Sequence, residues 1–170
     1  PDQYYQRAYE ITGEYPAVWG TDFIWQGSRD PGEEVVAAAI EKHNQGAIIT
    51  LMWHAGRPTD EPPFGWRESI QGKLTDEEWA ELTTPGTRLH SRWLEQVDRV
   101  AGHLKQLQAA NVPVLWRPYH EMNGVWFWWG DKKGQDGYIK LWKMLFDRYV
   151  NHHQLHNLIW VWNANAPRNL

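Results

Sequence analysis

The sequence predicts an α/β fold in which helices cover a parallel β-sheet. Short apolar segments rich in β-branched residues alternate with segments whose apolar residues recur every three or four positions. The strand segments are apolar at nearly every position, which is typical of strands buried on both faces. Two long loops both follow strands, at the end where α/β proteins place their sites. The 170 residues have the length of one domain.

The first predicted elements are a helix, a strand and a second helix. Residues 3–12 form a short amphipathic helix that Gly13 ends. Residues 16–23 form a strand. The next helix begins near Asp30 and runs to Gly46, with carboxylates in the first turn, where the helix dipole favours negative charge.

A buried strand and a long helix come next. Residues 47–53 form the strand, and the connection over 54–86 is rich in proline and glycine, with one short helix near 76–79. The helix over 87–110 is the most regular, because its apolar residues follow each other in steps of three and four. They are Leu89, Trp93, Val97, Val100, Leu104 and Leu107.

The remaining pattern is strand, loop, helix and strand. A strand begins at 114–116, and a second long loop covers 119–135. A helical stripe of apolar residues extends from Tyr138 to Tyr149, and 158–162 form the fourth strand. No repeat, low-complexity tract or linker interrupts the chain, so we expect one structural unit.

Composition and charge exclude several classes of protein. The chain has 17 basic and 21 acidic residues, with a net charge of −4 and no basic stripe, so no nucleic-acid partner is expected. No apolar run approaches the ~18 residues of a membrane-spanning helix. The absence of cysteine excludes disulfides, thiol nucleophiles and thiolate metal sites. The 13 tryptophans are more than core packing alone usually needs.

The groups that can carry chemistry gather after the third strand, within residues 116–130. This segment joins the carboxylate of Glu121, the imidazole of His120, the guanidinium of Arg117 and the carboxamide of Asn123 to an aromatic cluster. A glycosidase needs a carboxylic acid to protonate the leaving oxygen and aromatic faces on which sugars stack. Burial against aromatic rings would raise the pKa of the carboxyl group, and His120 or Arg117 would oppose that rise.

Structural explanations compete with this interpretation. A glutamate beside a histidine is more often a surface pair or a hydrogen-bonded structural group, and Trp116 is better explained by packing within its strand. The His-Glu pair resembles the start of a zinc-protease motif, but Gly124 occupies the position of the required second histidine. His152 and His156 have a metal-compatible spacing, yet they precede a strand at the opposite end from the candidate site. A solvated turn is favoured there, and no metal is predicted.

Other acidic residues have simpler explanations than catalysis. The pairs 33–34 and 77–78 are first-turn charges on helices. Asp22 and Asp30 are placed to reach the loop face, although Asp30 is equally explained as a turn or cap residue.

The longest recognisable pattern is residues 117–124 (RPYHEMNG) followed by 126–130 (WFWWG). It resembles the acid/base segment of glycoside hydrolase family 26, most of whose members are endo-β-1,4-mannanases. Residues 16–23 and 50–54 resemble earlier barrel strands of that family, and 158–163 resemble the strand after the acid/base segment. The likeness extends over essentially the whole chain.

The resemblance implies a role for each matching residue. Glu121 matches the general acid/base of the family, and His120 matches a histidine that contacts substrate. Trp126 matches an aromatic platform beside the cleaved bond, and His54 matches a histidine that binds sugar. Trp66, in the long connection, is expected to be a second stacking platform.

The resemblance also implies supporting residues and the absence of a cofactor. Arg117 and Asn123 are expected to hold Glu121 and its loop in place. Hydrolysis in this family implies no metal ion and no organic cofactor.

The resemblance implies an incomplete (β/α)₈ barrel of about four βα units. Residues 1–170 correspond to strands two to five of one catalytic domain, whereas a full barrel has roughly 250 residues. Retaining enzymes need a second carboxylate about 5–5.5 Å from the first. The later carboxylates are Asp131, Asp136 and Asp147, and none matches the nucleophile of the family, which is a glutamate on a later strand. We expect the 170 residues alone to be inactive.

The implied activity is cleavage of β-mannan by a retaining double displacement. Xylan or mixed-linkage β-glucan hydrolysis is an alternative within the family, and a non-catalytic carbohydrate-binding protein is an alternative from another class. A polymeric substrate implies an extracellular or cell-envelope location. The open edges of a partial barrel imply that the isolated chain aggregates or pairs with another copy.

Overall fold

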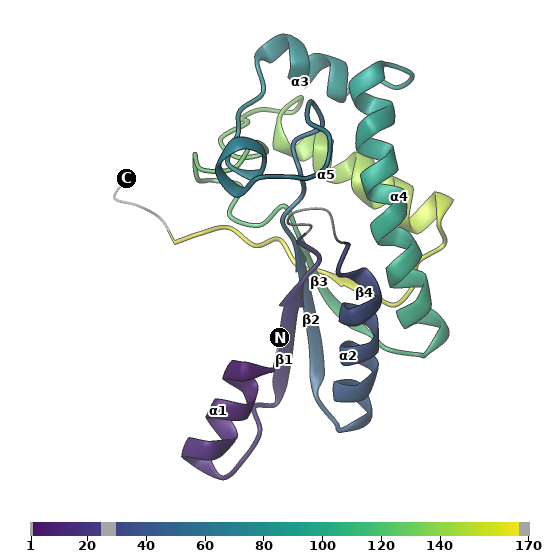
Figure 1. The fold of residues 1–170 in the computed structure, drawn as a ribbon. Coiled ribbons are helices and arrows are strands. Elements are labelled where there is room, and N and C mark those ends of the chain that lie inside the picture. The colour runs from purple at the N-terminus through teal and green to yellow at the C-terminus, as the bar shows by residue number, and fades with distance from the viewer. Residues whose placement is uncertain (1, 25–29, 167–170) are drawn as a thin grey trace.

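The fold is an alternation of strands and helices, as seen in a computed structural model that describes residues 2–24 and 30–166 (Figure 1). The strands are β1 (Val18–Asp22), β2 (Ile48–Trp53), β3 (Val114–Pro118) and β4 (Leu158–Trp160). The α-helices are α1 (Gln3–Thr12), α2 (Gly32–Asn44), α3 (Asp76–Leu82), α4 (Arg88–Ala109) and α5 (Tyr138–Asp147). Two π-helical turns are η1 (Trp66–Ile70) and η2 (Arg148–His152).

The four strands form one parallel sheet in the order β1-β2-β3-β4. Ile49 lies at the centre of the register, since it pairs with Trp19 of β1 and Val114 of β3. Val114 in turn pairs with Leu158 of β4. Each strand is therefore beside the one that precedes it in the sequence, and the predicted α/β class with a parallel sheet is confirmed.

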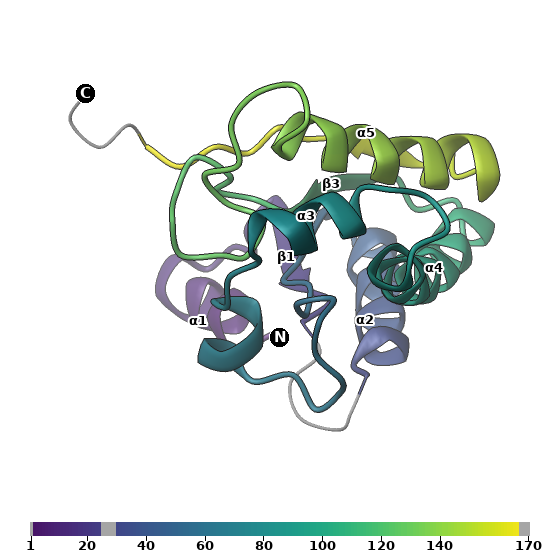
Figure 2. The same cartoon turned by 90° about the horizontal axis from the view of Figure 1, so that it is seen from above.

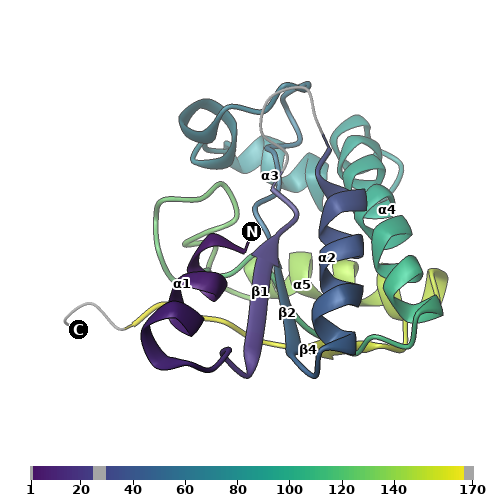
Figure 3. The same cartoon turned by 60° about the horizontal axis from the view of Figure 1, so that its bottom comes forward.

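The core lies between the sheet and the helices α2, α4 and α5, which all cover the same side of the sheet (Figures 2 and 3). Side chains that point to this side are fully buried, among them Trp19, Leu51 and Trp116. Leu104 of α4 and Leu141 of α5 are buried in the same cluster. Burial of these apolar side chains supplies the main stabilisation, at about 25 cal/mol for each Å² removed from water.

The opposite side of the sheet is open among the described residues. Val18, Ile48 and Ile159 are exposed by 47%, 53% and 56%. Near the amino ends of the strands, this side has an apolar hollow lined by Ile48, Leu115 and Ile159. The expectation that the strands are buried on both faces is therefore wrong for these positions. Such apolar residues are typical of strands whose second face points into a barrel.

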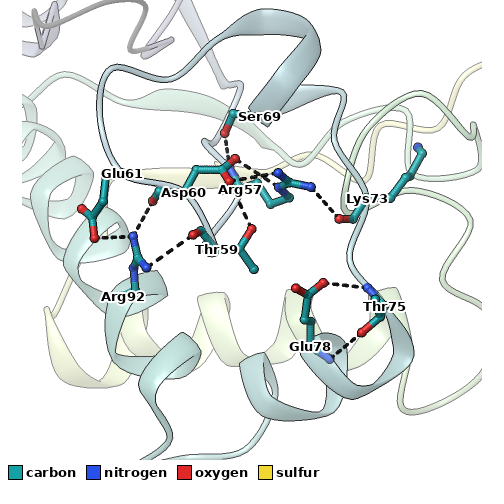
Figure 4. Close-up of polar contacts among 9 residues, drawn as sticks. All are labelled: Arg57, Thr59, Asp60, Glu61, Ser69, Lys73, Thr75, Glu78 and Arg92. Carbon is teal, nitrogen blue, oxygen red and sulfur yellow. Dashed lines mark hydrogen bonds and ion pairs between the residues drawn. The ribbon is translucent and has the colours of Figure 1, made fainter.

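The long connection between β2 and α4 is more ordered than the sequence predicted. It contains η1 as well as the expected short helix α3, whose Thr75 and Glu78 form a reciprocal capping box. The guanidinium of Arg57 binds both carboxylate oxygens of Asp60, at 2.9 and 3.1 Å, and donates to the carbonyl of Lys73 at 2.9 Å (Figure 4).

The same connection is tied to α4. The guanidinium of Arg92 donates to the backbone carbonyl of Asp60 at 2.7 Å and pairs with the carboxylate of Glu61 at 2.5 Å (Figure 4). The backbone amide of Arg57 donates to the hydroxyl of Ser69 in η1 at 2.8 Å. The bond to Ser69 holds η1, which contains Trp66, close to the residues that follow β2.

A charged cluster joins α4 to η2 and the turn after it. Asp98 accepts two hydrogen bonds from Arg148, at 2.6 and 2.8 Å, and lies 2.7 Å from Nε2 of His153. His152 and His156 are exposed, as expected of a solvated turn. None of the helices in the described part of the chain has the length and apolar character needed to cross a membrane.

Asp98→Asn should destabilise the fold in a pH-dependent way. Burial alone would raise the pKa of Asp98, but the hydrogen bonds from Arg148 and His153 outweigh burial, and the pKa lies below its ordinary value of 3.8. A lowered pKa stabilises the fold above the unfolded-state pKa, and this stabilisation is lost as pH falls through the folded-state pKa. We expect a loss of about 1 kcal/mol at pH 7, modest because Asp98 is 35% exposed.

Chemical denaturation of both proteins from pH 7 downward measures this difference. The gap between wild type and Asp98→Asn should shrink once the pH falls below the ordinary pKa. Asp136→Asn is the matched control, because the carboxylate of Asp136 is 96% exposed. A gap that stays constant with pH would contradict the assigned role of Asp98.

Candidate active site

The candidate site lies where β2 and β3 end. His54 follows β2 directly, and His120 and Glu121 come shortly after the end of β3. The ring centroids of His54 and His120 are 4.3 Å apart, and that of Trp66 is 5.1 Å from His54. Trp66 is 38% exposed. The carboxyl ends of neighbouring parallel strands thus bring His54 together with His120, 66 positions later in the sequence.

The chain after β3 turns sharply through two left-handed residues. Tyr119 and Glu121 have φ angles of +47° and +56°, which side chains other than glycine seldom adopt. The backbone amide of Glu121 donates to the carbonyl of Asn163 at 2.6 Å. The hydroxyl of Tyr138 donates to the carbonyl of Tyr119 at 3.0 Å. Strain of this kind persists only where surrounding contacts over-determine the backbone.

Buried aromatic residues provide further anchors for this turn. The phenol oxygen of Tyr119 accepts a hydrogen bond from the indole of Trp93 at 2.8 Å, and Tyr119 is fully buried. The indole of Trp129 donates to the carbonyl of His120 at 2.9 Å. The carbonyls of Tyr119 and His120 are thus held by aromatic side chains, and the amide of Glu121 is held by the segment after β4.

The carboxylate of Glu121 is partly buried and has a defined partner. The indole N–H of Trp126 donates to its Oε2 at 2.8 Å. The indole of Trp126 lies over Gly124, where an added Cβ would come within 2.3 Å of the ring. The small residue at 124 thus lets Trp126 reach back to Glu121, and the side chain of Trp126 is a hydrogen-bond donor as well as an aromatic surface.

Arg117 and Asn123 both bind the segment that follows β4. The guanidinium of Arg117 donates through Nε to the amide oxygen of Asn163 at 2.7 Å, with a second bond from Nη2. Asn123 exchanges two hydrogen bonds with the backbone of Asn165, at 2.8 and 3.1 Å. The carbonyl of Asn163 also accepts a hydrogen bond from the amide of Glu121. Arg117 and Asn123 therefore support the backbone of Glu121 through the segment after β4, and neither binds its carboxylate.

The two histidines of the site differ in their surroundings. His54 binds the carboxylate of Asp22 through both its ring and its backbone amide. His120 is 5% exposed, and its burial together with the neighbouring His54 lowers its pKa to about 4, against the opposing charges of Asp22 and Glu121. His120 is therefore a neutral imidazole near pH 7.

The other carboxylates that follow Glu121 in the sequence bind partners of their own. Asp131 pairs with Lys133, Asp136 with Lys140, and Asp147 accepts from Asn151. Among the described residues there is no group of three or more potential ligands that could hold a metal ion. The site thus offers the carboxyl group of Glu121, the pair of Asp22 and His54, the imidazole of His120 and a wall of aromatic rings.

Some of the contacts in this site were not predicted from the sequence. The sequence places Asn163 only in a strand resembling the family, and Asp22 only at the loop face. Their positions still indicate a part in the site, because each comes at or shortly after the carboxyl end of a strand, as His54 and Glu121 do. The left-handed conformations of Tyr119 and Glu121 had no signal in the residue types.

Comparison with known proteins finds a matching family and several relatives. The family model described as Glycosyl hydrolase family 26 matches residues 2–170. Mannan endo-1,4-beta-mannosidase A of Piromyces sp is 38% identical over 170 residues, covering 94% of this chain and 27% of that protein. The mannan endo-1,4-beta-mannosidase of Thermothelomyces thermophilus is 40% identical, covering 92% of this chain and 34% of that protein.

Solved structures match the fold closely. The structure of GH26A from Muricauda sp. MAR_2010_75 has a TM-score of 0.98 and 64% identity, covering 100% of this chain and 56% of that chain. A beta-mannanase from a symbiotic protist of the termite Reticulitermes speratus, complexed with gluco-manno-oligosaccharide, has a TM-score of 0.84 and 32% identity. The match covers 98% of this chain and 53% of that chain. The chain thus spans about a third of these curated relatives and about half of these solved chains. The predicted fold, part of a (β/α)₈ barrel, is confirmed.

Gly124→Ala should break the contact between Trp126 and Glu121. The new methyl group would meet the indole at 2.3 Å, so the ring must move away from Oε2. We expect a large change in the indole ¹H–¹⁵N resonance of Trp126, with the fold retained. Gly102→Ala in α4 is the matched control, because nothing lies within 4 Å of its added Cβ. An unchanged indole resonance in Gly124→Ala would contradict the packing described here.

Proposed function

This chain belongs to glycosyl hydrolase family 26, and from that premise we propose that it supplies the general acid/base of an endo-β-1,4-mannanase. One observation carries the proposal above all. Glu121 is held at the end of β3 with its Oε2 bound by the indole of Trp126, beside an aromatic wall. A carboxyl group in such a position is suited to protonate a glycosidic oxygen.

The proposed reaction is a double displacement. Glu121 gives its proton to the glycosidic oxygen as the bond from that oxygen to the anomeric carbon breaks and a second carboxylate bonds to the same carbon. Glu121 then removes a proton from water, whose oxygen displaces the second carboxylate and releases the sugar. Because Oε2 accepts the Trp126 hydrogen bond, the transferable proton belongs on Oε1. The second carboxylate is not among the acidic residues that follow Glu121 in this chain.

The remaining site residues are proposed to bind the sugar. Trp66 and Trp126 offer indole faces that suit the C–H surfaces of a pyranose. His120 is neutral, and its Nδ1 is buried without a hydrogen-bond partner among the described residues, so the other ring nitrogen, Nε2, is proposed to bind a sugar hydroxyl. His54 contributes the second imidazole. No metal ion or organic cofactor takes part in the proposed reaction.

The proposed substrate is a β-1,4-mannan. This choice is supported by the printed names of the Piromyces and Thermothelomyces relatives and by the gluco-manno-oligosaccharide bound to the protist enzyme. A polymer of this kind is met outside the cell, so we propose an extracellular or cell-envelope location. Assays on mannan, xylan and mixed-linkage β-glucan separate the substrates, and highest activity on xylan or glucan would contradict the choice of mannan.

Glu121→Ala should affect substrates according to how much their leaving groups need a proton. In the active enzyme that carries this chain, we expect hydrolysis of mannan to fall by about 10²–10⁴-fold. An aryl mannoside with a good leaving group should form the covalent intermediate nearly as fast as with the wild type. Steady-state rates on mannan and burst kinetics on the aryl mannoside measure the two effects.

Two controls sharpen this experiment. Glu121→Gln keeps the hydrogen bond from Trp126 but cannot donate a proton, so it should behave like Glu121→Ala. Asp131→Ala removes a nearby carboxylate that pairs with Lys133 and should leave both rates unchanged. Equal losses on mannan and aryl mannoside would contradict the assignment of Glu121 as the acid.

The isolated 170 residues should self-associate. The open side of the sheet exposes Val18, Ile48 and Ile159, and burying apolar surface in a second copy is favourable. Sedimentation velocity should show dimers or larger species whose share rises with concentration. Ile48→Lys and Ile159→Lys should lower that share, and a monodisperse wild-type monomer at all concentrations would contradict the expectation.

A further inference from the structure

The interaction between Asp22 and His54 has a role that the proposed reaction leaves unassigned. Asp22 is the last residue of β1, and His54 is the first residue after β2, the strand paired with β1. The backbone amide of His54 donates to Oδ1 of Asp22 at 3.1 Å, and the ring atom Nδ1 lies against Oδ2. Both side chains are mostly buried, with 14% and 11% exposed.

These two bonds together determine which ring nitrogen of His54 carries the proton. An ionised carboxylate only accepts hydrogen bonds, so Nδ1 must be the donor. In the neutral imidazole the other nitrogen, Nε2, is then bare and can only accept. Nε2 has no hydrogen-bond partner among the residues that the structure describes, whereas Nδ1 is fully occupied.

The other groups around His54 leave this arrangement undisturbed. His120 faces it edge-on with a ring centroid at 4.3 Å, and the rings of Trp66, Phe127 and Trp129 lie at 5.1, 5.2 and 6.4 Å. None of these aromatic rings competes with Asp22 for Nδ1. The ring of His54 therefore stands between a carboxylate on one side and the aromatic wall of the site on the other.

We propose that Asp22 is a positioning residue that fixes His54 in the Nδ1–H form, so that Nε2 accepts a hydrogen bond from a hydroxyl group of the bound sugar. The part concerning the sugar rests on the proposed function, but the part concerning the proton rests on the contacts of Asp22 alone. Asp22 also fixes the orientation of the ring, because its two oxygens hold both the backbone and the side chain of His54.

Asp22→Asn gives a sharp test of the proton position. The backbone amide of His54 still needs an acceptor, so the amide oxygen of the new side chain should face it and the NH₂ group should face Nδ1. Nδ1 must then accept, and the proton should move to Nε2. Long-range ¹H–¹⁵N correlation spectra of the protein with ¹⁵N-labelled histidine, recorded at about pH 8 where ordinary histidines are neutral, distinguish the two forms.

The expected spectra show His54 as Nδ1–H in the wild type and as Nε2–H in Asp22→Asn, with the signal assigned by its loss in His54→Ala. Asp98→Asn is the matched control, because it removes a second Asp–His contact, that with His153, far from the site. It should leave the His54 signal unchanged. A proton on Nε2 of His54 in the wild type, in either the neutral or the charged ring, would overturn the proposal.

A kinetic cycle in the active enzyme tests the link to the sugar. Asp22→Asn should lower kcat/KM on manno-oligosaccharides by about tenfold or more, the scale of loss seen when the hydrogen-bond partner of a metal-bound histidine is removed. In the His54→Ala background, Asp22→Asn should cause no further loss, because Asp22 acts through His54. An equal loss in both backgrounds, or no loss in either, would overturn the role of Asp22. If the enzyme does not cleave mannan at all, the proposed function fails while the spectra still decide the proton position.

Discussion

The hydrogen bond from the backbone amide of Glu121 to the carbonyl of Asn163 is the interaction on which the site depends. It joins the turn after β3 to the segment after β4, and Arg117 braces the same asparagine through its side chain. Together with the hydrogen bonds from Tyr138, Trp93 and Trp129, it offsets the left-handed conformations of Tyr119 and Glu121, which cost of order 1–3 kcal/mol each. The backbone of Glu121 is therefore fixed by the segment after β4, and its carboxylate is held by the indole of Trp126.

The tryptophan excess serves packing more than the sequence suggested. Seven indoles are buried in the core, namely Trp19, Trp53, Trp79, Trp93, Trp116, Trp128 and Trp129. Several of them also donate hydrogen bonds, to Tyr119, to the carbonyl of His120 and to the carbonyl of Ala55. A large ring that fills space and satisfies a backbone group makes the floor of the site rigid, and a rigid floor keeps catalytic groups in place.

The sequence predicted the elements well because burial imposes a local period on them. The apolar steps over 87–110 correspond to α4, and the continuous apolar run over 47–53 corresponds to β2. It could not predict the turn of η1, nor which partners Glu121 and His54 select, because those contacts join Glu121 to Asn163 and His54 to Asp22 across 42 and 32 positions. The sequence shows that a carboxylate is present, but the residues that it contacts depend on the register of the sheet. The apolar residues of the strands do not by themselves predict the open face of the sheet, since they look alike whether or not a second layer covers them; only the resemblance to part of a barrel predicts that face.

The central claim is that the ends of β2 and β3 assemble one site around the glycosidic oxygen, with Glu121 as the proton donor. A crystal structure of the Glu121→Gln variant of the active enzyme, with a manno-oligosaccharide spanning the cleaved bond, tests it most directly. We predict that the amide nitrogen Nε2 of residue 121 lies at about 2.6–3.2 Å from the glycosidic oxygen, with a sugar ring stacked on Trp126 or Trp66. A sugar chain bound with its glycosidic oxygens far from residue 121 would contradict it.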